Sequence, residues 1–169
     1  MRPLSSFLLL PFLLTSACTA DDGVDDQVVY AVLDTAYFLY SQNIVGLPVG
    51  PQDVTADCQF GGTVQMVGET SGKGGTSVDM VFAFTDCATS GSGYDVTTAG
   101  DLAWSGTFSP RGYKALAWSS DQLKVVGPVQ GDTEAVDVEE NCALAITERG
   151  EDGGTSVVSG EWCGREVYF

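Results

Sequence analysis

The apolar positions between residues 24 and 42 recur with the spacing of an amphipathic helix. They form one broad face, made of Val28, Val29, Val32, Ala36, Leu39 and Tyr40. Asp21 or Asp22 can cap this helix, and Asp25 and Asp26 lie in its first turn, where unpaired backbone N–H groups stabilise carboxylates. A single helix with so wide an apolar face must pack on another element. We therefore predict a helix from Val24 to about Gln42 that covers an apolar surface.

From Cys58 onward the apolar positions alternate with polar ones, which is the period of a strand. The alternating runs are residues 63–66, 77–84, 94–108, 116–126 with an interruption at "SSDQ", 136–146 and 155–163. Short connections such as "SGKGG" and "EDGG" make neighbouring strands antiparallel, whereas "NIVGLPVGP" is a connector rich in Gly and Pro. The pattern predicts a mainly β fold, an antiparallel meander of about six strands with the N-terminal helix packed on its apolar face.

The run at residues 94–108 separates two faces of the predicted sheet. Its polar positions are Thr97, Asp101, Ser105 and Thr107. The three tryptophans occupy apolar positions and are expected in the core or in cross-strand pairs, with the lining of a ligand cleft as the alternative. They are Trp104, Trp118 and Trp162.

The start of the chain has the pattern of an export signal. Arg2 precedes the short apolar run "FLLLPFLL", which is far below the roughly 20 residues of a membrane-spanning helix. The small residues Thr15, Ser16 and Ala17 follow, and then Cys18. This order is typical of a secretory signal that is removed on export.

The same residues, with Ala17 before Cys18, resemble the lipobox of bacterial lipoproteins. The resemblance implies cleavage just before Cys18 and a lipid on that cysteine; the alternative is an ordinary secretory signal. It divides the chain into a signal peptide over residues 1–17, an acidic tether over 18–26 and a single disulfide-stapled, β-rich domain over 24–169. In enterobacterial lipoproteins Asp after the cysteine retains the protein in the inner membrane. Thr19 stands there, so the resemblance favours the outer membrane.

Charge narrows the set of partners. Without Arg2, six basic residues face 23 acidic ones, a formal charge of −17. Nucleic acid is not expected as a partner, because phosphate contacts need basic residues. The membrane is contacted through the anchor rather than through the acidic surface. One acidic cluster could bind calcium as an alternative. Specific calcium binding is disfavoured because no Asp-x-Asp-x-Asp-Gly loop is present. The cluster is Asp132, Glu134, Asp137, Glu139 and Glu140.

The chain contains no histidine. This composition excludes Ser-His-Asp and Cys-His catalysis and removes the commonest ligand of catalytic zinc. No phosphate-binding loop or dinucleotide-binding glycine motif occurs either. We therefore expect a protein that is not an enzyme, with no catalytic residues, no metal ligands and no cofactor. A hydrolase that uses two carboxylates is the least implausible enzyme.

Four cysteines lie in the predicted domain: Cys58, Cys87, Cys142 and Cys163. An even number in an exported chain indicates disulfides, and four cysteines allow three pairings. The midpoint of Cys58 and Cys87 falls in "SGKGG", and that of Cys142 and Cys163 falls in "EDGG". Residues equidistant from a hairpin turn face each other, which favours Cys58–Cys87 and Cys142–Cys163. A four-cysteine metal site is disfavoured because no Cys-x-x-Cys spacing occurs.

A longer motif runs from Cys58 to Gly106. It consists of Cys58, Gly61, Gly62, Thr63 and Gly68, then Phe84 and Cys87, then Gly100, Leu102, Trp104 and Gly106. In this order the residues resemble a group of small, β-rich, secreted bacterial lipoproteins. The resemblance implies a fold and a location and no activity.

These observations favour a lipid-anchored protein of the bacterial cell envelope with a structural or interaction role. Its partners would be the membrane, through the anchor at Cys18, and another envelope protein. The alternative is a periplasmic binding or carrier module for a lipid or another hydrophobic ligand, because a curved sheet under a helix can hold one.

Overall fold

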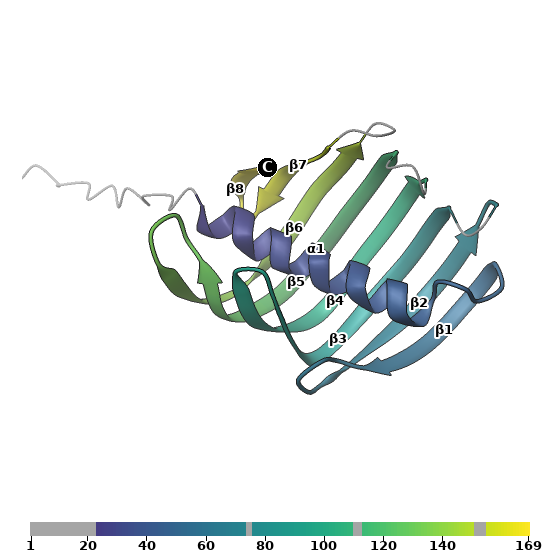
Figure 1. Cartoon of the computed structure of the whole chain (residues 1–169), viewed down its shortest axis with the longest axis horizontal. Coiled ribbons are helices and arrows are strands. Elements are labelled where there is room, and N and C mark those ends of the chain that lie inside the picture. The colour runs from purple at the N-terminus through teal and green to yellow at the C-terminus, as the bar shows by residue number, and fades with distance from the viewer. Residues whose placement is uncertain (1–22, 74–75, 110–112, 151–154) are drawn as a thin grey trace, which may run out of the picture.

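The computed structural model describes residues 23–73, 76–109, 113–150 and 155–169. One α-helix precedes eight strands, and the strands form a single antiparallel sheet in chain order (Figure 1). The elements are α1 (Val24–Asn43), β1 (Gly50–Asp57), β2 (Thr63–Ser71), β3 (Ser77–Gly91), β4 (Tyr94–Phe108), β5 (Lys114–Gln130), β6 (Ala135–Gly150), β7 (Ser156–Trp162) and β8 (Arg165–Tyr168). The mainly β class, the meander and the helix on one face of the sheet are confirmed.

The predicted number of strands was too low. β1 was assigned in part to the connector, because Gly50 and Pro51 are residues typical of loops. β8 lies beyond the predicted last strand and begins only two residues after Cys163. Along β5 the "SSDQ" segment does not end the strand; instead the pairing with β6 shifts register between Ser120 and Leu123. A local irregularity of this kind breaks the alternation without breaking the strand.

Helix α1 begins at Val24, as the apolar spacing predicts, and residues 24–26 of the predicted tether form its first turn. Gly23 occupies the N-cap position and makes no side-chain cap. The proposed capping residues Asp21 and Asp22 lie outside the described residues. Figure 1 shows the helix lying across the strands on one face of the sheet.

The core lies between α1 and the sheet. The three tryptophans are buried there, and Trp104 and Trp118 stack at a centroid distance of 4.7 Å. Tyr40 meets Trp104 edge-on at 4.8 Å, which joins the helix to this stack. Aromatic contacts of this geometry add to the stabilisation from area burial. The prediction that the tryptophans belong to the core is therefore confirmed.

Two polar contacts hold the middle of α1 to the strands. Asp34 accepts a hydrogen bond of 2.6 Å from the Tyr94 hydroxyl, and the buried hydroxyls of Thr35 and Thr89 lie 2.7 Å apart. Burial is the first cause that raises the pKa of Tyr94 above its usual value, and the hydrogen bond to Asp34 adds to it. These bonds fix the rotation of the helix over the sheet, since buried polar groups are costly without a partner.

The first turn of α1 is fixed to the C-terminal hairpin by Arg165. Its guanidinium donates to both carboxylate oxygens of Asp25, at 2.6 Å each, and to Glu140 at 2.6 Å. Charge-assisted, bidentate pairs of this kind are among the stronger hydrogen bonds. The backbone N–H of Tyr168 also donates to Asp26. Residues more than a hundred positions apart are thereby joined at one end of the molecule.

Both predicted disulfides are present, Cys58–Cys87 and Cys142–Cys163, with Cα separations of 5.4 and 5.1 Å. The spacing predicts that the two cysteines of each pair face each other across a hairpin. The structure does not place them in this way. Cys58 lies in the turn between β1 and β2, and Cys163 lies in the turn between β7 and β8. Each bridge therefore ties a turn to a strand, Cys87 in β3 or Cys142 in β6.

Gly106 in β4 allows the strands to approach closely. Its φ of +132° and the 2.2 Å from an added Cβ to the carbonyl oxygen of Ala115 leave no room for a side chain. We expect Gly106→Ala to lower the free energy of unfolding by about 2–3 kcal/mol, because strain and a backbone clash act together. Ser105→Ala, at the exposed neighbour, is the control and is expected to change it by less than about 0.5 kcal/mol. Urea denaturation of both variants measures the difference, and equal stabilities would contradict the prediction.

Candidate functional site

An open hollow lies on the face of the sheet opposite to α1. Its floor comes from strands β4 to β7 near the turns that join β4 to β5 and β6 to β7, and its volume is about 850 Å³. The exposed positions on this face alternate along each strand with buried ones, such as Leu116 in β5 and Val158 in β7, which face the helix. A volume of this size is in the range of small-molecule sites.

Short side chains create the depth of the hollow. On β5, Ala117 lies opposite Ser105 of β4 and Thr147 of β6, and Ala115 is the next residue along the same face. These four side chains carry at most a methyl and a hydroxyl group beyond Cβ. The backbone of the sheet is therefore close to the surface here, and the floor is broad and flat.

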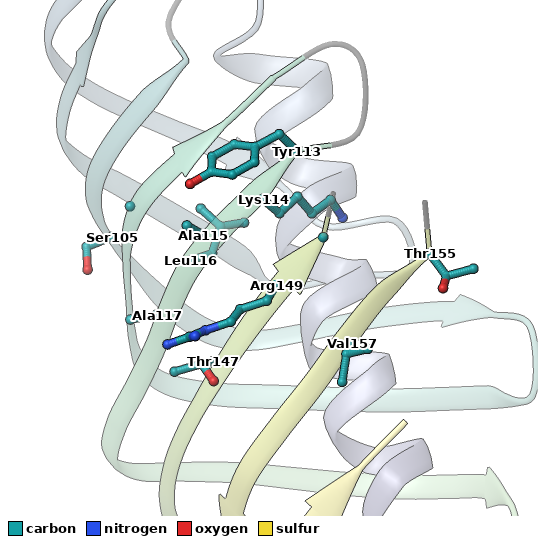
Figure 2. A pocket seen from close by; sticks show the side chains of 12 residues that line it. Ser105, Tyr113, Lys114, Ala115, Leu116, Ala117, Thr147, Arg149, Thr155 and Val157 are labelled. Carbon is teal, nitrogen blue, oxygen red and sulfur yellow. The ribbon is translucent and has the colours of Figure 1, made fainter. Parts of the chain in front are cut away.

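Two long side chains border this floor. Figure 2 shows the Tyr113 ring on one side and the Arg149 side chain on the other, with Ala115 between them. Arg149 lies directly opposite Ala115 on β5 and Val157 on β7. Its closest cross-strand neighbours are therefore apolar.

Arg149 differs from the other cations of the sheet. Lys114, Lys124 and Arg165 each pair with a carboxylate. Within the described ranges Arg149 makes no ion pair and no side-chain hydrogen bond. An exposed guanidinium in a strongly acidic protein is thus left available to a ligand that carries its own negative charge.

The opposite side of the same strands carries a buried polar cluster under the helix, formed by Glu148, Lys114 and Tyr37. The Glu148 side chain is 4 % exposed and accepts a hydrogen bond of 2.5 Å from the Lys114 ammonium. Its second oxygen accepts from the Tyr37 hydroxyl. The Lys114 ammonium also lies 4.6 Å from the centre of the Tyr37 ring. All the polar atoms of the carboxylate are therefore satisfied inside the core.

The pKa of Tyr37 lies far above its usual value, first because the ring is buried and then because the hydroxyl donates to the Glu148 carboxylate. The unfolded chain loses this phenolic proton above pH 10, whereas the folded chain keeps it. The folded state then binds more protons, so its stability must fall as the pH rises above 10.

We expect Tyr37→Phe to reduce this alkaline loss by up to about 1 kcal/mol per pH unit above pH 10. Urea denaturation at pH 9 and at pH 11 measures the loss in each protein. Tyr168→Phe is the matched control, because Tyr168 is 67 % exposed. If the two variants lost equal stability between these pH values, the role assigned to Tyr37 would be wrong.

A second cluster combines Glu140 with the Cys142–Cys163 disulfide. The carboxylate and the two sulfurs lie within 4.8 Å of one another. The sulfurs are bonded to each other, and a disulfide offers no thiolate to a metal. Glu140 already accepts from the Trp162 indole and from Arg165. This arrangement is a structural junction between the helix and the last hairpin.

The residues proposed for calcium do not converge in the described part of the chain. Glu139 pairs with Lys124 at 3.8 Å, while Glu140 pairs with Arg165. Asp132 and Glu134 lie in the turn between β5 and β6. The five carboxylates form no group of three with ligand atoms close together. The predicted lipidation site, Cys18, and the whole predicted leader lie outside the described residues.

Sequence reasoning placed Ser105 on the polar face but did not find Arg149, Tyr113 or the cluster at Glu148. The burial of Glu148 could have been predicted from the sequence. It follows Leu144 and Ile146 at the alternating apolar positions of β6, and the side chain must therefore point into the core. Arg149 gives no comparable signal, since a basic residue at an exposed position is ordinary.

Among its described lining residues the hollow offers the Arg149 guanidinium, several hydroxyls and a flat apolar floor. Groups of these kinds can bind a ligand. Comparisons with known proteins indicate no function for the site, because no family model, no curated protein and no solved structure matches the chain. Among the described residues no helix has the length and apolar character needed to cross a membrane.

Proposed function

We propose that this chain is a lipid-anchored protein of the bacterial cell envelope with a structural or interaction role, and that it is not an enzyme. The observation that carries the proposal is the leader, in which a positive start and a short apolar run end at Ala17 and Cys18. Several acyl chains on that cysteine would hold the protein on a membrane stably. Thr19 favours the outer membrane by its resemblance to enterobacterial lipoproteins.

The two disulfides support export to an oxidising compartment, because such bonds persist outside the cytosol. The distance between anchor and domain is also informative. Five residues separate Cys18 from the first residue of α1. They reach at most about 20 Å when extended. The first turn of α1 and the C-terminal hairpin paired with it would therefore lie near the bilayer.

Fractionation of the native protein and of Cys18→Ser tests the anchor. The native protein is expected in the membrane fraction after a high-salt wash, and the variant is expected in the soluble periplasmic fraction. Crosslinking of intact envelopes then tests the interaction role. The native chain should give a discrete crosslinked band that the Cys18→Ser variant lacks. A soluble native protein would contradict the anchor, and a native protein without crosslinks would contradict the interaction role.

The second candidate is a periplasmic carrier, and the hollow on the open face supports it. In the described part of the chain large side chains fill the space between the helix and the sheet, which favours a carrier site elsewhere. Phe82, Trp104 and Trp118 are each at most 1 % exposed there. Any carried ligand would therefore bind on the outer face. Native mass spectrometry of the exported protein distinguishes the two candidates, since a carrier releases a small molecule on unfolding.

A further inference from the structure

We propose that the hollow binds a small organic monoanion, a carboxylate attached to a flat apolar body, and that Arg149 pairs with the carboxylate. The inference uses only the described residues of β4 to β7 and does not depend on the lipid anchor. Arg149 is therefore assigned as a ligand-binding residue of a site that its neighbours shape.

The ligand needs a negative charge because one basic side chain at the hollow has no carboxylate partner among the residues that the structure describes. Lys114 also borders the hollow, but its side chain lies on the helix side of the sheet, where the ammonium pairs with Glu148. Arg149 alone, among the charged side chains described at the hollow, has no partner. A guanidinium binds a carboxylate through two parallel hydrogen bonds, which a neutral ligand cannot reproduce.

The net charge of the protein limits the ligand to one negative charge. The whole chain has a formal charge of −16. A dianion such as phosphate would gain one close cation and meet the repulsion of the remaining carboxylates at longer range. A monoanion is neutralised by Arg149 and avoids most of this cost. A carboxylate is therefore favoured over phosphate or a nucleotide.

The shape and lining of the hollow call for a flat apolar body. Ala115 and Ala117 offer methyl groups at the level of the sheet, and Val157 offers an exposed apolar side chain on β7. The Tyr113 ring, 45 % exposed, forms a wall on the other side (Figure 2). A planar ring system can lie on the methyl groups beside the tyrosine and keep its carboxylate at Arg149. The Ser105 and Thr147 hydroxyls, on either side of Ala117, can add hydrogen bonds to the ligand.

The test is an NMR titration of the full chain carrying Cys18→Ser, with both disulfides intact. The probes are 2-naphthoate, the neutral 2-naphthamide and inorganic phosphate. We expect 2-naphthoate to shift the amide signals of Ala115, Ala117 and Thr147 with a dissociation constant of about 1 mM, as its number of atoms allows. The amide is expected to bind at least about tenfold more weakly, because it lacks the charge.

Arg149→Gln tests the assigned residue and is expected to weaken 2-naphthoate binding at least about tenfold. Lys124→Gln is the matched control, because it removes the same charge from β5 at the far end of the sheet, at a side chain that is 49 % exposed. It should change the affinity less than about twofold, since exposed charges beyond a Debye length are screened. Ala117→Leu should abolish binding by filling the floor.

Several outcomes would overturn the inference. They are the absence of shifts at the hollow, equal affinity for 2-naphthoate and 2-naphthamide, tighter binding of phosphate, and an Arg149→Gln variant that binds as the parent does. Arg149 is exposed and makes no described side-chain contact with a polar partner, so its replacement leaves the fold intact and the comparison valid. Amide dispersion in the free variants verifies this point.

Discussion

Removing both disulfides is expected to lower the free energy of unfolding by about 7 kcal/mol, the largest effect of any change considered. The bridges span sequence separations of 29 and 21 residues. In the chain-entropy model each closed loop of this size contributes about 3–4 kcal/mol, because the unfolded chain loses freedom. A domain of this size has a total stability of about 5–15 kcal/mol. The variant with four Cys→Ser substitutions is therefore expected to be largely unfolded at 37 °C.

Circular dichroism and urea denaturation of three variants measure this effect. The paired variants Cys58→Ser with Cys87→Ser, and Cys142→Ser with Cys163→Ser, each keep one bridge and serve as controls for each other. Their losses should be similar and should add, since the bridges lie at different turns of the sheet. A fourfold variant that unfolds at the same urea concentration as the parent would show that the bridges do not stabilise the fold.

Glu148→Ala is expected to destabilise the protein by about 3–4 kcal/mol. The substitution leaves the Tyr37 hydroxyl and the Lys114 ammonium without their acceptor beneath the helix. Breaking a buried ion pair by removing one partner typically costs about 3–5 kcal/mol. The lower part of that range applies here, because the Lys114 side chain is 28 % exposed and can turn towards water.

Glu148→Gln is the matched control, since the amide oxygen can still accept one hydrogen bond. We expect it to lose about half as much stability as Glu148→Ala. A double-mutant cycle with Lys114→Met isolates the pair from the rest of the cluster, and the double variant should recover part of the loss. Equal unfolding free energies for Glu148→Ala and the parent protein, in urea at pH 7, would refute the structural role of the carboxylate.

Local periodicity was sufficient to predict the helix, the antiparallel meander and the burial of the tryptophans. The start of α1 at Val24 matches the apolar spacing, and Trp104 and Trp118 occupy alternating apolar positions on strands that pair directly. Such patterns record which face of an element is buried, and this is what a sequence specifies most strongly.

Features that depend on contacts between distant segments could not be predicted. Pro51 lies in an edge strand, where the missing N–H costs no ladder hydrogen bond, and a single sequence does not show which strand lies at the edge. The hollow needs Ser105, Ala117 and Thr147 to meet across three strands, which depends on register. The disulfide pairing was predicted correctly, but the cysteines do not face each other across a hairpin as expected. The prediction still succeeded because the two cysteines of each pair lie on opposite sides of a hairpin turn along the chain.

The central proposal, a lipid anchor at Cys18, is tested most directly by the mass of the N-terminal peptide of the mature protein. The native chain, expressed in a Gram-negative bacterium, is extracted from the membrane fraction and digested before mass spectrometry. We expect a peptide that begins at Cys18 and carries diacylglycerol and an amide-linked acyl chain. A peptide that begins elsewhere, or an unmodified Cys18, would contradict the lipid anchor and indicate an ordinary exported protein.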